Sequence, residues 1–109
     1  MRALLLGLLF LLPGDSPSLR LTANPRTGFA PIDVEIRVYL TGSERAVIVS
    51  LYDSDGFLLR SSGQDLLGEK LVYLKWKRIG PCDCRLIATT NDSKGHQVTK
   101  SLDLHYLGM

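Results

Sequence analysis

The feature that most constrains the fold is a strict two-residue alternation of apolar and polar side chains. In segment 33–40, DVEIRVYL, every second residue is apolar. The apolar set consists of Val34, Ile36, Val38 and Leu40. Because successive side chains of a β-strand point to opposite faces, this pattern predicts a strand with one buried face. We therefore expect Val34, Ile36 and Val38 to lie in the core.

The same alternation recurs along the chain. It is found in segments 46–52, 70–77, 84–90 and 97–107, and residues that favour turns separate these segments. No long stretch has the three-to-four-residue apolar spacing of an amphipathic helix. Short alternating strands divided by turns are typical of an antiparallel β-sandwich. The sequence thus predicts an all-β, immunoglobulin-like sandwich of about seven strands.

Three further residues are predicted to point inward. Trp76 is in phase with the apolar residues before it in segment 70–77, and Cys84 is in phase with Leu86. Burial of a large aromatic side chain dominates local packing. We therefore expect Trp76, Cys84 and Leu86 to join the core.

The first 18 residues have the composition of a secretory signal peptide. Arg2 precedes an apolar run over residues 3–12, and a Ser-x-Ser pattern ends at Ser18. The run is shorter than the about 20 residues that span a bilayer. We expect residues 1–18 to be removed and residues 19–109 to form one domain without a transmembrane span. That domain is expected to be secreted, periplasmic or on the cell surface.

Cys82 and Cys84 are the only cysteines in the chain. An oxidising compartment favours disulfides, and residues two apart in a strand point to the same face. Three interpretations remain open. Cys84 is an unbonded core residue with Cys82 at the strand entrance, or the pair forms a local disulfide close to the geometric limit. Alternatively, the pair holds a metal, although a zinc site needs about four ligands.

Two stretches resemble the PKD domain, an immunoglobulin-like sandwich of secreted and cell-surface proteins. The matching residues of the first stretch are Ala23, Pro25, Gly28, Ala30, Pro31 and Val34. Those of the second are Pro81, Leu86, Asp92 and Gly95. Prolines suit strand entrances, where no ladder donor is needed, and Gly28 is expected to permit a tight turn between them.

The resemblance covers residues 21–107 but departs from the family at two places. Cys84 stands where the family has an inward aromatic residue. The family's W-D-F-G-D-G hairpin is reduced to SLYDSDG, in which Tyr52, Asp55 and Gly56 match. The resemblance implies a non-catalytic unit that contacts proteins or carbohydrates.

Charge and motifs exclude several other functions. The chain has 13 Lys and Arg against 11 Asp and Glu, and its net charge is +2. The cations are scattered, whereas a nucleic-acid-binding protein concentrates them on one face, so we expect no nucleic-acid partner. The sequence has no G-x-S-x-G, Walker or H-E-x-x-H motif, and we expect neither catalysis nor a cofactor.

The segment DSDG at residues 53–56 has two interpretations. Asp53 and Asp55 could contribute to a calcium site, although the oxygens and the Glu that complete an EF-hand loop are absent. Alternatively, the segment forms a hairpin turn in which Gly56 follows Asp55 and adopts a positive φ.

Two hypotheses about function follow. In the first, the domain binds a protein or glycan through a sheet face, where apolar residues fall on the outward phase of their strands. These residues are Tyr39, Ile48, Tyr52, Tyr73 and Ile87. In the second, the chain is a small periplasmic protein that uses Cys82 and Cys84 for metal or redox chemistry.

The leader hypothesis predicts a processed N-terminus. N-terminal sequencing of the exported protein is expected to begin near Leu19, because the small residues before it suit signal peptidase. A soluble cytosolic protein that retains Met1 would contradict the hypothesis.

Overall fold

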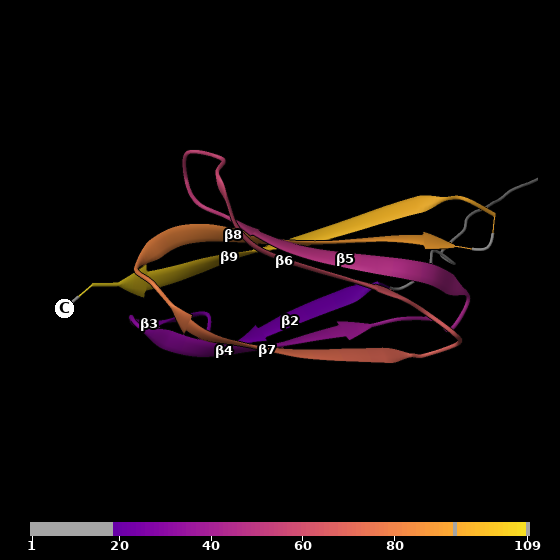
Figure 1. The fold of residues 1–109 in the computed structure, drawn as a ribbon, viewed down its shortest axis with the longest axis horizontal. Coiled ribbons are helices and arrows are strands. Elements are labelled where there is room, and N and C mark those ends of the chain that lie inside the picture. The colour runs from indigo at the N-terminus through magenta and orange to yellow at the C-terminus, as the bar shows by residue number, and fades with distance from the viewer. Residues whose placement is uncertain (1–18, 93, 109) are drawn as a thin grey trace, which may run out of the picture.

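The computed structural model describes residues 19–92 and 94–108, which form eight β-strands in two facing sheets (Figure 1). The strands are β2 (Arg20–Asn24), β3 (Thr27–Phe29), β4 (Ile32–Tyr39), β5 (Glu44–Tyr52), β6 (Leu58–Asp65), β7 (Leu71–Ile79), β8 (Cys82–Asp92) and β9 (Gln97–Leu107). The smaller sheet has the order β2-β4-β7 and the larger the order β3-β9-β8-β5-β6.

The predicted fold class is confirmed. Neighbouring strands run antiparallel except β3, whose three residues pair in parallel with the end of β9. The predicted signal peptide, residues 1–18, lies outside the described residues. Within the described part of the chain, no helix is long and apolar enough to cross a membrane.

The core lies between the two sheets, where their inward side chains meet. From β4 it receives Val34, Ile36 and Val38, all buried as expected. The larger sheet contributes Val47, Val49, Leu51, Cys84, Leu86, Ala88, Leu104 and Tyr106. Burial of one large aliphatic side chain stabilises a fold by about 1.5–3 kcal/mol. This inter-sheet contact therefore dominates the stability of the domain.

Trp76 differs from the prediction, because it packs against the core but is only partly buried. It has the inward phase, but β7 is an edge strand, so the core reaches only one side of its side chain. At this margin Arg60 of β6 donates a hydrogen bond to the Lys77 carbonyl oxygen at 2.8 Å. This side of Trp76 therefore borders a polar hydrogen bond and not the apolar side chains that would bury a core tryptophan.

Gly28 also has a different role from the one expected. It lies within β3, opposite Tyr106, and not in a turn. A Cβ at this position would lie 2.7 Å from Cδ1 of Ile32, so the close approach of that side chain requires glycine. Pro25 and Pro31 occupy the connections before and after β3, as expected for residues that donate no ladder hydrogen bond.

Glu44 closes the loop between β4 and β5 from a buried position. Its carboxylate accepts hydrogen bonds from the N–H groups of Thr41, at 3.0 and 3.1 Å, and of Gly42, at 3.0 Å. Burial alone raises the pKa of Glu44, but these hydrogen bonds outweigh it and the net pKa is lowered.

This lowered pKa predicts an acid-sensitive loop. The stabilising contribution of the Glu44 carboxylate is fully present above its ordinary pKa of 4.5 and is lost as the pH falls through the lower folded-state value. Glu44→Gln should destabilise the protein at neutral pH and flatten the decline in its stability below that value. Urea denaturation across the acid range measures both effects, and parallel curves for the two proteins would contradict the assignment.

Candidate binding site on the outer face of the larger sheet

The outward apolar residues separate into two groups on opposite sides of the sandwich. Ile48, Tyr52 and Ile87 lie on the outer face of the larger sheet, and Tyr39 and Tyr73 lie on that of the smaller sheet. Ile48 is 52% exposed and Tyr73 is 48% exposed. The two faces therefore offer two separate apolar surfaces to solvent.

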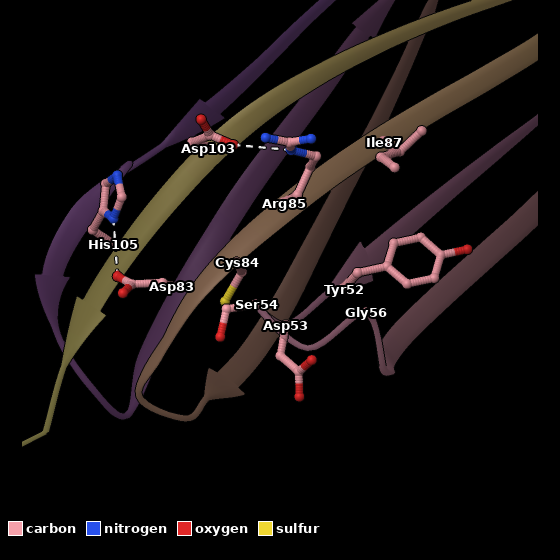
Figure 2. Close-up of a pocket in the computed structure, with 10 residues that line it drawn as sticks. All are labelled: Tyr52, Asp53, Ser54, Gly56, Asp83, Cys84, Arg85, Ile87, Asp103 and His105. Atoms are coloured by element: carbon pink, nitrogen blue, oxygen red, sulfur yellow. Dashed lines mark hydrogen bonds and ion pairs between the residues drawn. The ribbon is translucent and has the colours of Figure 1, made fainter.

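A pocket of about 560 Å³ opens on the outer face of the larger sheet (Figure 2). It lies where β8 and β9 meet the turn between β5 and β6, which projects from the sandwich in Figure 1. The lining residues are Tyr52, Asp53, Ser54, Gly56, Asp83, Cys84, Arg85, Ile87, Asp103 and His105. Segments from the middle and the end of the chain thus form one site.

One ion pair and one histidine–carboxylate contact cross from β8 to β9 along the pocket. Nε of Arg85 lies 3.1 Å from Oδ1 of Asp103, and Nδ1 of His105 lies 3.0 Å from Oδ1 of Asp83. Both pairs join residues that are directly opposite in the strand register. All four side chains are more than half exposed, so each pair adds only about 0–1 kcal/mol to stability. The pairs fix the directions of polar groups that a ligand can reach.

The turn beside the pocket depends on Asp53. Its Oδ1 accepts hydrogen bonds of 2.9 Å from the N–H groups of Asp55 and Phe57, and Gly56 has a φ of +86°. These contacts correspond to the hairpin-turn interpretation, in which Asp55 contributes its backbone rather than its carboxylate. Residues 19–92 and 94–108 contain no group of three or more His, Cys, Asp or Glu side chains that could hold a metal ion.

The structure joins Cys82 and Cys84 by a disulfide at the start of β8. Their Cα atoms are 5.3 Å apart, within the usual range for such a bond. Cys84 is buried on the core side and also forms part of the pocket wall, whereas Cys82 is partly buried. The structure thus has the two cysteines bonded to each other, and a metal or redox role for the pair stays a hypothesis.

Several pocket residues could not be identified from the sequence. His105 lies on the surface, and alternation within β9 gives no sign of its contact with Asp83. Asp103 is likewise an ordinary outward residue of an alternating strand. Only the register between β8 and β9 brings these groups together, and alternation within one strand fixes the face of each residue but not which residue of the partner strand lies opposite.

No family model matches the chain, and no curated protein matches it. Solved structures do resemble it. CopC from Methylosinus trichosporium OB3b has a TM-score of 0.63 and 15% identity, over 85% of this chain and 95% of that chain. Spo0M, a sporulation control protein from Bacillus subtilis, has a TM-score of 0.60 and 8% identity, over 87% of this chain and 51% of that chain.

A third similar structure is the CARDB domain of the PF1109 protein from Pyrococcus furiosus, solved in complex with di-metal ions. It has a TM-score of 0.50 and 17% identity, over 85% of this chain and 96% of that chain. At these identities the comparisons establish the fold. This fold is an immunoglobulin-like β-sandwich. None of the three is described as a PKD domain.

The turn geometry predicts different effects for its two aspartates. Asp53→Ala should lower the free energy of unfolding by about 1–3 kcal/mol, because two backbone N–H groups lose a charged acceptor. Asp55→Ala should stay within about 0.5 kcal/mol of the native protein. Chemical denaturation with and without added calcium measures both variants. Stabilisation of the native protein by calcium that is lost in Asp53→Ala would favour the calcium interpretation instead.

Proposed function

We propose that this chain is an exported, non-catalytic, PKD-like module that binds an uncharged saccharide in the outer-face pocket. One observation carries the proposal: the pocket combines an aromatic side chain with polar groups that already contact one another across the strands. Its volume of about 560 Å³ lies within the range of about 300–1,000 Å³ that is usual for small-molecule sites.

The excess of carboxylates in the lining disfavours an anionic ligand, and the contacts that already hold the polar groups favour hydroxyl groups over a cation. Arg85 is balanced by Asp103, and the Asp53 oxygen that accepts two amides is held by its own turn. A charged ligand would have to compete with these internal partners. A saccharide hydroxyl can instead donate to a carboxylate lone pair or accept from a guanidinium N–H without separating the pair.

The apolar part of the pocket suits the C–H groups of a sugar ring. Tyr52 and Ile87 lie on neighbouring strands, β5 and β8, and are diagonal neighbours in the register. Diagonal neighbours of this kind are within reach of one another when one of them is aromatic. Figure 2 places both along the same side of the pocket. A ring bound there would contact Tyr52 while its hydroxyl groups meet the ion pairs.

The non-catalytic part of the proposal rests on the exposure and the partners of two carboxylates. A glycosidase uses one carboxyl group whose surroundings keep it protonated as a general acid. Here Asp83 and Asp103 are more than half exposed, and each is paired with a basic side chain. Such groups suit hydrogen bonding to a ligand better than proton transfer.

Tyr52→Ala tests the saccharide site. Glycan-array screening identifies a ligand, and calorimetry with that ligand should show binding weakened about tenfold in the variant, since loss of the ring contact removes about 1.4 kcal/mol. Tyr73→Ala, on the opposite face, is the matched control and should bind as the native protein does.

Two results would reject the site. One is a glycan array on which the native protein binds no neutral saccharide more strongly than denatured protein does. The other is equal weakening by Tyr52→Ala and Tyr73→Ala, which would place binding elsewhere or attribute the loss to folding.

A redox role for the cysteine pair is the second candidate function. The observation that favours it is the disulfide itself, because Cys84 forms part of the pocket wall. The CARDB domain, whose structure contains di-metal ions, offers weaker support for metal binding. Thiol titration and metal analysis of the purified protein distinguish these roles from saccharide binding.

A further inference from the structure

The outer face of the smaller sheet presents two stacked arginine–tyrosine pairs. Cζ of Arg20 lies 4.3 Å from the centre of the Tyr39 ring, and Cζ of Arg37 lies 5.1 Å from the centre of the Tyr73 ring. Arg20 is opposite Tyr39 in the β2–β4 register, and Arg37 is opposite Tyr73 in the β4–β7 register. The pairs therefore occupy successive rows of the same face.

Stacking orients the arginines for binding. A guanidinium over a tyrosine ring is attracted by the negative face of the ring, which limits the conformations of a long side chain. Its N–H groups lie in the guanidinium plane and remain able to donate, apart from the contact between Arg37 and Glu35 at 3.6 Å. Less conformational entropy is then lost when a carboxylate binds these groups in bidentate fashion.

The composition of the face resembles that of a protein interface. Tyrosine and arginine are enriched in the residues that dominate binding energy, whereas isolated lysines contribute less. Beside the stacked pairs, Leu71 is 47% exposed, and Leu71 is opposite Tyr39 in the register. The outward residues of the three strands include four cations, Arg20, Arg37, Lys75 and Lys77, and two carboxylates, Asp33 and Glu35.

We propose that this Arg–Tyr face, defined by Arg20, Tyr39, Arg37, Leu71 and Tyr73, binds a protein surface that presents carboxylates around an apolar centre. The excess of cations complements acidic side chains, and Leu71 and Tyr73 supply area that an apolar partner group would cover. The face lies opposite the pocket, so this inference does not depend on saccharide binding.

A polypeptide fits the face better than a nucleic acid or an acidic polysaccharide. Asp33 and Glu35 lie among the cations and would repel a dense row of phosphates. Glu35 is opposite Lys75 in the register, which further reduces the charge available to a polyanion. The apolar residues of an acidic protein surface would cover Leu71, which phosphate or sugar carboxylate groups would not.

The probe is a soluble copolymer of glutamate and tyrosine, titrated against the full-length protein and measured by NMR chemical shifts. We expect saturable binding that weakens with salt and shifts signals of the Arg–Tyr face. Arg37→Lys retains the charge but loses the planar fork, and binding should weaken about tenfold. Arg20→Lys provides an independent second variant, and native-like spectra of each variant verify its fold.

Arg85→Gln, in the pocket on the other face, is the matched control and should bind the copolymer like the native protein. The inference is overturned if the copolymer does not bind, or if Arg37→Lys and Arg20→Lys both bind it unchanged. It is also overturned if alginate or single-stranded DNA of equal charge binds more tightly, or if Arg85→Gln weakens binding as much as Arg37→Lys. Loss of saccharide binding in Tyr52→Ala would leave the inference about the Arg–Tyr face unaffected.

Discussion

The rest of the structure depends on the contact between the inward face of β4 and the inward faces of β5 and β8. Ile36, Val38 and Leu86 are fully buried there. Close packing of this kind fixes the register of each strand, since a slip of one residue would turn the apolar set toward solvent. The same register determines which outward residues become neighbours on the outer faces of the sheets.

Substitution of an outward residue consequently has little effect on the stability of the fold. Arg85 and Asp103 meet only because Leu86 and Leu102, their neighbours on the inward phase, are opposite each other in the same ladder. The exposed ion pairs add little to folding, so retaining them is not necessary for the sandwich. The proposed saccharide site uses this arrangement beside Tyr52.

The two outer faces have different chemistry. On the larger sheet, paired charges surround a pocket beside the turn held by Asp53. On the smaller sheet, Arg37 and Arg20 stack on tyrosines in a continuous, open surface. The two proposals together describe a module that joins a saccharide on one side to an acidic protein on the other, with the rigid core setting the distance between them.

Alternation alone determined the fold class and most of the core, because the period of a strand is a local property of the chain. Val34, Ile36, Val38 and Leu86 could be placed in this way. Alternation could not predict the order of the strands in each sheet. The edge position of β7 in that order leaves Trp76 partly exposed. The close approach of Ile32 to Gly28 was equally inaccessible. The pocket, the ion pairs and the arginine–tyrosine stacks required the tertiary structure, because they depend on which residues become neighbours across strands, and packing between distant segments decides that register.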